Sequence, residues 1–320
     1  MFLLIVRRCW GLFWVCAFLS ACAAQSLSSG RSTPLPAPVR GRQLHGQLVE
    51  LRTQRVLSLD AFITANTAVR LIAVGEEHDH PDIQAFELQL LQALSQQHPQ
   101  HLALAMEFLE RDMQPWVDAF LAGRSDAATL QQQMKASPTF IQYYFPLLDY
   151  ARQAGIPVLA MNLPRRLARQ VAQQGLQPVL SAVTTPERQY VPMALTPLTP
   201  QYRTYFQQAV ARAHPLSAEQ TERFLEASHL KDETMAETLS TYMTGRPHHT
   251  VLAIAGRFHI DYGLAIPARL QQRAPALSLR RLTTMSVEAD EMVDVLQLEQ
   301  QDLADYVWFA PPHPAAKTGT

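Results

Sequence analysis

Polar side chains follow four apolar runs of the sequence at the point where each run ends. Residues 75–80 read Gly-Glu-Glu-His-Asp-His, and residues 256–259 read Gly-Arg-Phe-His. Glu107 and Asn162 follow the other two runs. Histidine and carboxylate side chains of this kind hold first-row metal ions or transfer protons. The sequence therefore offers one candidate polar cluster for chemistry, made of Glu76, His78, Glu107, Asn162 and His259.

A nucleophile is missing from this cluster. No serine lies in the turn pattern of a nucleophile elbow, and no segment matches a phosphate loop or a dinucleotide fingerprint. The three cysteines, Cys9, Cys16 and Cys22, all lie in the first 22 residues. An enzyme built on the cluster would therefore act through activated water. Each residue also has an ordinary structural explanation, since a carboxylate after a strand often caps a helix.

The alternation of apolar runs and helical patterns predicts the elements that position these residues. Runs of strand length cover six stretches, residues 69–74, 102–106, 156–161, 251–255, 277–279 and 306–309. Helical spacing lies between them, as in the segment that begins at Pro81. The pattern predicts an α/β fold with a mostly parallel sheet flanked by helices. Because the carboxyl ends of parallel strands share one edge, we expect a single pocket there.

Two longer stretches, residues 112–150 and 195–245, are helical in pattern and contain no obvious strand. We predict helical insertions, which either form a smaller all-helical domain or cap or simply cover the sheet. The chain has 320 residues, 48% of them hydrophobic and 17% charged, which suffices for a large folded core. Its net charge of -1 lacks the basic surplus of a typical nucleic-acid binder, so no nucleic-acid partner is expected.

The N-terminus carries the features of an export signal. Two arginines precede an apolar run of signal-peptide length, and residues 19–22, Leu-Ser-Ala-Cys, resemble a bacterial lipobox. We therefore expect residues 1–21 to be a signal peptide and Cys22 to carry lipid, palmitate included. The lipid would anchor the protein in a membrane, and Ala23 after the cysteine favours the bacterial outer membrane. A plain secretory signal or an uncleaved anchor is the alternative.

The segment after the cysteine predicts a linker. Residues 22–44 are rich in Ser, Pro and Gly, so we expect a flexible tether that carries the lipid. The folded domain is expected to begin near His45 and to span residues 45–312, with a flexible tail over residues 313–320.

Several motifs occur in an order that is typical of one family. They are Gly75-Glu76-x-His78, Ala105-Met106-Glu107, Met161-Asn162-x-Pro164, Asp232-x-x-Met235-Ala236 and Ala255-Gly256-Arg257-x-His259. This ordered set, over about residues 69–309, resembles the ChaN family of haem-binding lipoproteins in the Tiki superfamily. The sequence departs from the family pattern at Lys231, where a tryptophan is expected before Asp232. We expect this departure to affect local packing only.

The resemblance implies a role in iron and haem acquisition, as a binding protein rather than an enzyme. It implies that ferric haem is the cofactor, with a directly bound metal ion as the alternative. It further implies that two protomers dimerise around two stacked haems. A TonB-dependent outer-membrane receptor is the expected protein partner.

The resemblance also implies a tyrosine as the ligand of the haem iron. The helical insertions offer five, namely Tyr143, Tyr144, Tyr202, Tyr205 and Tyr242. We rank Tyr144 first, because Pro146 interrupts the chain two residues later and should leave this aromatic segment near a rim of the sheet. His214 and His229 are the alternatives among histidines. The residues expected to contact haem are therefore Tyr144, Tyr143, His78, Arg257 and His259.

A hydrolase is the second hypothesis, because other branches of the superfamily resemble proteases and esterases. Such an enzyme would be metal-dependent or acid/base-dependent, esterase-like or peptidase-like, and would use Glu76, His78, Glu107 and His259. Under either hypothesis a buried Glu107 requires a hydrogen-bond donor. We expect that donor among the nearby arginines, Arg165, Arg166 and Arg257.

Overall fold

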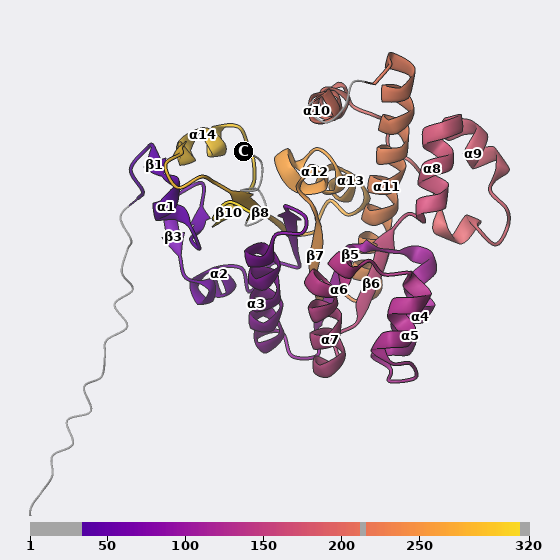
Figure 1. The fold of residues 1–320 in the computed structure, drawn as a ribbon, viewed down its shortest axis with the longest axis horizontal. Coiled ribbons are helices and arrows are strands. Elements are labelled where there is room, and N and C mark those ends of the chain that lie inside the picture. Colours follow the sequence, from indigo (N-terminus) through magenta and orange to yellow (C-terminus); the bar gives the residue numbers. More distant parts are fainter. Residues whose placement is uncertain (1–33, 212–215, 314–320) are drawn as a thin grey trace, which may run out of the picture. The chain divides into compact units, whose positions relative to one another are not determined.

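Parallel strands form the centre of the fold. The computed structural model describes residues 34–211 and 216–313, and in these ranges six parallel strands lie in the order β10-β8-β4-β7-β5-β6 (Figure 1). Short strands β2 and β3 continue the sheet antiparallel beside β10. The strands are β2 (Leu48–Glu50), β3 (Arg55–Leu57), β4 (Leu71–Glu76), β5 (Leu102–Glu110), β6 (Val158–Asn162), β7 (Thr250–Gly256), β8 (Leu279–Ser286) and β10 (Tyr306–Ala310). The predicted α/β fold with a mostly parallel sheet is confirmed.

The position of β7 decides which strand ends meet. This strand comes late in the chain but lies between β4 and β5, and Glu76 of β4 pairs in register with Gly256 of β7. Every residue of β4 and β7 is buried, as expected for parallel strands that are covered on both faces. The polar residues that follow β4, β5, β6 and β7 therefore lie along one edge.

The first insertion covers one face of the sheet. One hydrophobic core joins its helices, through Phe120 and Leu147, to Ile83 of α3. The same core includes Ile72 and Leu104 of the strands. The elements of this layer are α2 (Leu59–Ala65), α3 (Pro81–Gln97), η1 (Arg111–Met113), α4 (Gln114–Leu121), α5 (Ala127–Met134), α6 (Pro138–Tyr143) and α7 (Phe145–Ala154). Of the two arrangements left open for residues 112–150, the structure therefore has the covering one.

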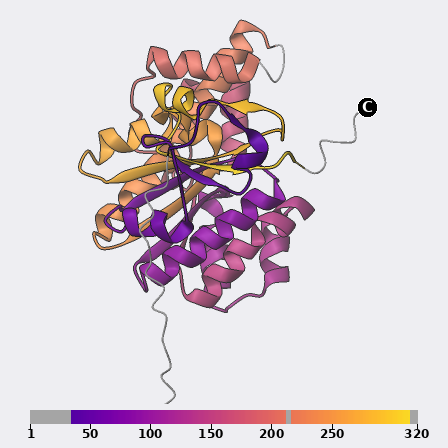
Figure 2. The ribbon, with the colours of Figure 1, turned by 90° about the vertical axis from the view of Figure 1, so that its left-hand side faces the viewer.

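The second insertion both covers the opposite face and extends beyond the sheet. The C-terminal half of α11 (Ala218–Gly245) packs Met235 and Leu239 against alternate strand residues such as Ala73 and Ala105. Its N-terminal half lies beyond the carboxyl edge of the strands, and Figure 2 shows the sheet between the two helical layers. The neighbouring elements are α8 (Arg165–Gln174), α9 (Leu176–Ala182), η2 (Arg188–Tyr190), α10 (Pro200–Ala211), α12 (Arg257–Ile260), η3 (Asp261–Gly263) and α13 (Ile266–Arg273).

The helices beyond the carboxyl edge pack through small cores of their own. Leu167 and Val171 of α8 pack with Ala227 and Leu230 of α11, while Tyr202 and Phe206 of α10 pack elsewhere against Leu225. These helices therefore form a cap above the strand ends. The described residues 34–211 and 216–313 nonetheless cluster as one compact unit, so the cap belongs to the same folded body as the sheet.

The folded body begins earlier than the sequence indicates. Val39 and Leu44 are buried, and β1 (Val39–Arg40) pairs with β9 (Met292–Val293) next to α14 (Val295–Gln300). The tether predicted for residues 22–44 is therefore wrong from β1 through α1 (Gly41–Leu44). A two-residue strand and a one-turn helix carry too little pattern to be recognised, and their partners lie about 250 residues away.

The C-terminal boundary also differs by one residue. His313, predicted to begin the flexible tail, hydrogen-bonds the backbone carbonyl of Asp79 through Nε2 at 2.8 Å. The predicted signal peptide, Cys22 and the rest of the tail lie outside the described residues. Within the described ranges no helix is both long enough and apolar enough to cross a membrane.

Candidate functional site

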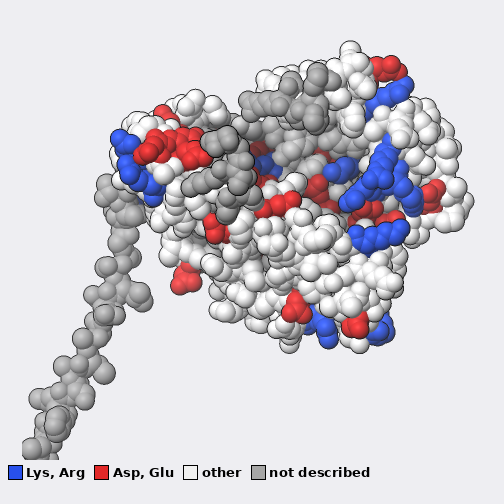
Figure 3. Space-filling model, in the orientation of Figure 1, with Lys and Arg blue, Asp and Glu red and all other residues white. Residues whose placement is uncertain are grey.

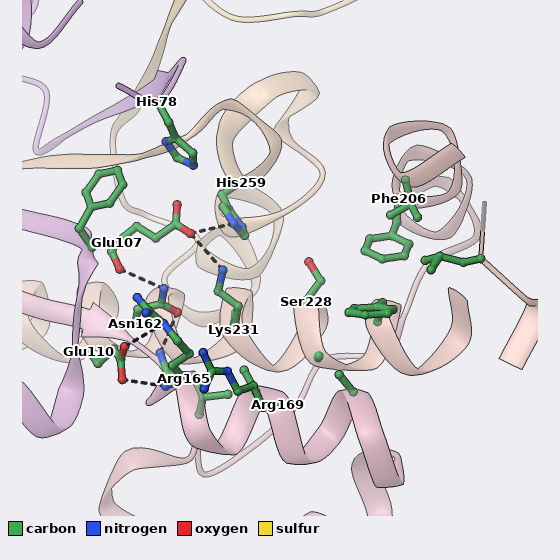
Figure 4. A pocket seen from close by; sticks show the side chains of 18 residues that line it. His78, Glu107, Glu110, Asn162, Arg165, Arg169, Phe206, Ser228, Lys231 and His259 are labelled. Carbon is green, nitrogen blue, oxygen red and sulfur yellow. Dashed lines mark hydrogen bonds and ion pairs between the residues drawn. The ribbon is translucent and has the colours of Figure 1, made fainter. Parts of the chain in front are cut away.

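A cavity of about 610 Å³ lies between the carboxyl edge of the sheet and the cap helices. Its inner end is polar and includes His78, Glu107, Lys231 and His259, as Figure 4 shows. Its outer part is lined by apolar side chains of α10 and α11, namely Phe206, Val210 and Phe224. The mouth is visible as a hollow bordered by blue basic side chains in Figure 3. A pocket is therefore present at the predicted edge, although Arg257 and Phe258, which follow β7, line a separate cavity.

His78 reaches the cavity from the loop after β4, and Glu76 holds it from behind. The Nδ1 atom of His78 lies 2.5 Å from Oε1 of Glu76, which is buried while the His78 ring is half exposed. Gln84 donates from Nε2 to the other Glu76 oxygen at 2.5 Å. No described residue forms a hydrogen bond with Nε2 of His78. The arrangement fixes the ring and leaves one nitrogen toward the cavity.

The pKa values of this pair follow from burial and from their mutual contact. Burial raises the pKa of Glu76, although the contact with His78 opposes that effect. The hydrogen bond to Glu76 raises the pKa of His78, with burial acting in the opposite direction. Glu76 therefore strengthens the basicity of the imidazole.

Tyr144 supports this pair from inside the core and does not reach the cavity. Its side chain is buried, its hydroxyl donates to Oε1 of Glu76 at 3.0 Å, and its ring stacks on Phe108 with centroids 3.8 Å apart. Burial, followed by the charge of Glu76, raises the Tyr144 pKa. Tyr144 as the iron ligand stays an untested prediction, and in this structure Phe108 covers the phenol and Glu76 accepts its hydrogen bond.

Glu107 is the centre of a second polar group at the end of β5. Its Oε1 lies 3.1 Å from Nζ of Lys231 and 3.2 Å from Nε2 of His259, and its Oε2 accepts from the backbone N–H of Gly256 at 2.8 Å. Burial raises the pKa of Glu107, but His259 and Lys231 outweigh burial and hold it well below its usual range. Glu107 is therefore an ionised carboxylate with three donors.

The donors of Glu107 correct two expectations from the sequence. Arg165, Arg166 and Arg257 do not supply them, because Arg165 and Arg166 pair with Glu110 and Glu187 on the cap side. Lys231, where a tryptophan was expected, is not a matter of packing alone, since it brings an ammonium group into the cavity.

His259 is engaged at both ring nitrogens. Besides the contact with Glu107, its Nδ1 lies 2.5 Å from Oδ1 of Asp232, and the other Asp232 oxygen accepts from the Tyr202 hydroxyl at 2.5 Å. Burial lowers the pKa of His259, but Glu107 and Asp232 outweigh it and raise the pKa to about 9. At neutral pH His259 is therefore a cation between two carboxylates and has no free lone pair for a ligand.

Several residues expected at the site lie elsewhere. Arg257 turns away and pairs with Glu77 and Asp261, each at 2.9 Å. Tyr143 packs on the core of the sheet, and His229 is buried against Arg269, with its pKa lowered to about 4 by burial and by that arginine. The other tyrosines are also outside the cavity lining, and His214 lies outside the described residues.

Asn162 lies in the cavity wall, as predicted, and its side chain hydrogen-bonds the backbone there. Its side-chain amide donates to the backbone carbonyl of Glu107 at 3.0 Å, and its oxygen accepts from the N–H of Leu163 at 2.8 Å. Asn162 thus joins the ends of β5 and β6. In the described part of the chain, no group of three or more His, Cys, Asp or Glu side chains is arranged to hold a metal ion directly.

Sequence comparison matches most of this body to a known family. A family model described as haem-binding uptake, Tiki superfamily, ChaN, matches residues 62–270. The matched span includes Glu76, His78, Glu107, Asp232 and His259.

Comparison with one solved structure supports the fold. A structure of ChaN of Campylobacter jejuni with cofacial haem binding gives a TM-score of 0.62 at 16% identity, covering 82% of this chain and 95% of that one. An erythromycin esterase EreC mutant in its open conformation gives 0.44 at 14% identity, covering 76% and 77%. Protein RETICULATA-RELATED 5, chloroplastic, of Arabidopsis thaliana is 24% identical over 267 residues, or 78% of this chain. The chain spans only 35% of that plant protein.

Proposed function

Because this chain belongs to the ChaN family of the Tiki superfamily, we propose that it binds haem in the cavity at the carboxyl edge of its sheet. The observation that carries the proposal is His78, a histidine in the cavity wall with one nitrogen held by Glu76 and no described partner for the other. Histidines that ligate a metal usually donate their second N–H to a carboxylate, which fixes the ring and raises its basicity.

The residues of the cavity suit a porphyrin. Haem would supply an iron that accepts a side-chain ligand, an apolar ring and two carboxylates. The Nε2 atom of His78 would hold the iron, and Glu76 would keep the proton on Nδ1. The aromatic and aliphatic side chains of α10 and α11 would cover the ring and exclude water. The cavity of about 610 Å³ lies within the range of sites for ligands of this size.

A spectroscopic titration tests the proposal. Haemin added to the purified chain should give a saturable Soret shift with a defined stoichiometry. No shift at any haemin concentration would overturn the proposal. In that case we would expect the protein to hydrolyse an ester or peptide, because the Glu76–His78 pair also has the form of a general base oriented by a carboxylate. That acid/base hydrolase is the second candidate function.

Replacing Tyr144 with phenylalanine should leave the haem spectrum and haem affinity close to those of the wild type. The change removes one hydrogen bond to Glu76, so we expect a loss of about 1 kcal/mol in the free energy of unfolding. Haemin titration and thermal unfolding check both parts. Loss of a tyrosinate charge-transfer band in the variant would instead identify Tyr144 as the iron ligand.

We propose further that the protein takes part in iron and haem acquisition as a lipoprotein of the outer membrane. The family supports this role, and residues 19–22 support the lipid anchor. In the same proposal the haem is ferric, for which a strongly basic imidazole is a suitable ligand. The same proposal includes dimerisation of two protomers around stacked haems and an interaction with a TonB-dependent receptor.

Cys22→Ala should abolish both palmitate labelling and membrane association. Acyl chains bind a membrane with about 0.8 kcal/mol per buried methylene, so their loss releases the protein. Metabolic labelling and fractionation of cells measure the two effects. Cys16→Ala is the matched control, since that cysteine lies within the predicted signal peptide. A Cys22→Ala variant that keeps its label would contradict lipidation at this residue.

A further inference from the structure

The cap helix α8 presents a regular set of side chains to the cavity. Arg165, Ala168, Arg169 and Ala172 all line it, because positions three and four residues apart share one face of a helix. Arg165 and Arg169, one turn apart, therefore supply two guanidinium groups at the cavity wall, and Ala168 and Ala172 supply small side chains on the same face. Figure 4 shows Arg165 and Arg169 as neighbours on this helix.

The anions around the cavity already have partners. Glu107 is paired with Lys231 and His259, and Asp232 is paired with His259. Glu110 lies 3.5 Å from the Arg165 guanidinium and also accepts from the backbone N–H of Arg165 at 2.7 Å. The charges of Glu107, Asp232 and Glu110 are therefore balanced by cations of this chain.

Arg169 differs from the other cations of the cavity. It is exposed and forms no ion pair or side-chain hydrogen bond with any residue that the structure describes. Arg166, three positions before it, pairs instead with Glu187 at 2.6 Å and does not line the cavity. An unpaired guanidinium beside an apolar cavity is a binding element for a planar anion, because its N–H groups match a carboxylate in a bidentate way.

We infer that Arg169, assisted by Arg165, recognises the carboxylates of the ligand and sets the preference of the cavity for a porphyrin that carries carboxylates on one edge. The inference rests on the proposed haem binding and adds a specificity residue to it. Lys231 is less suited to the task, because its ammonium already pairs with Glu107 at 3.1 Å. The apolar Phe206 and Phe224 then face the part of the ring without carboxylates.

The test compares haemin with its dimethyl ester, in which both carboxylates are blocked. Wild-type protein should bind the ester about tenfold more weakly than haemin, since a charge-assisted contact is lost. Arg169→Gln should bind haemin about tenfold more weakly than the wild type and should no longer discriminate between haemin and the ester. Arg166→Gln removes the same charge from the same helix outside the cavity and should behave as the wild type. Thermal unfolding confirms that each variant is folded.

The outcomes separate this inference from the proposed function. If the wild type binds haemin and Arg169→Gln binds both ligands with unchanged affinity and unchanged discrimination, Arg169 is not the recognition residue while haem binding stands. If Arg169→Gln weakens haemin and the ester equally, the residue acts through packing and the inference is also overturned. If the wild type binds no haemin, both proposals fall together.

Discussion

His78→Ala should lower the affinity for haem by at least about 100-fold, because loss of a supporting residue behind a metal ligand already costs 10- to 100-fold. The variant removes the one cavity histidine with a nitrogen that no described residue engages. Haemin titration followed by the Soret band measures the loss. The protein should remain folded, since His78 is half exposed and its ring is not part of the core.

Two further variants sharpen this result. Glu76→Gln keeps a side chain of the same shape but removes the charge that raises the basicity of His78, so we expect about a tenfold loss of affinity. His248→Ala removes an exposed histidine that does not line the cavity, and it should bind haem like the wild type. If His78→Ala binds haem with unchanged affinity and an unchanged spectrum, another side chain holds the iron.

The sequence could predict the strand-end residues because topology alone brings them together. Glu76, Glu107 and His259 follow strands β4, β5 and β7, whose parallel carboxyl ends lie side by side. That argument needs only the alternation of strands and helices. The contacts between individual side chains could not be predicted, because no local sequence pattern shows that β7 lies between β4 and β5.

The contacts that Lys231 and Asp232 make at the site were not predicted, for a different reason. Lys231 and Asp232 lie within one long helix, where charged residues are normally taken as a solvated face. Glu107, the partner of Lys231, lies more than 120 residues earlier in the chain, and His259, the partner of Asp232, lies on α12, so no local spacing links these residues. Helical periodicity in α8, with Arg165 and Arg169 four residues apart, was the signal available for the rim.

Tyr144 lies in the core and not at a rim, for a physical reason. An aromatic segment before Pro146 was expected to lie near a rim, yet α7 continues from Phe145 and its side chains Leu147 and Leu148 enter the core. The segment is thereby held under Phe108, and the Tyr144 hydroxyl meets a buried carboxylate. Proline at the first turn of a helix begins that helix rather than ending the structure.

Glu107→Ala should destabilise the fold by about 3–5 kcal/mol, the cost of removing one partner from a buried charge network. Two buried or partly buried cations, Lys231 and His259, would lose their shared carboxylate. Thermal or urea unfolding measures the change. Glu110→Gln is the matched control, because the side chain of its partner Arg165 is 71% exposed and such a pair contributes at most about 1 kcal/mol.

The pH dependence of the free energy of unfolding shows whether the charges of Glu107 and His259 cause this loss of stability. The lowered pKa of Glu107 stabilises the folded state above the ordinary carboxyl pKa, and this contribution is lost as acid protonates Glu107. The raised pKa of His259 stabilises the folded state below the ordinary pKa of about 6.5, and this contribution is lost as the pH rises through about 9. The wild type should therefore gain most from the network between about pH 5 and 7.

Removing the carboxylate should flatten the alkaline side of that profile, because His259 then keeps only Asp232 to hold its proton. Lys231→Met in the Glu107→Ala background should recover part of the lost stability, since it removes a cation that has no other carboxylate partner in the described chain. A Glu107→Ala variant with the wild-type unfolding midpoint and an unchanged pH profile would show that the network contributes nothing to the fold. The cavity wall would then be held by the Asn162 contact between β5 and β6 rather than by charge.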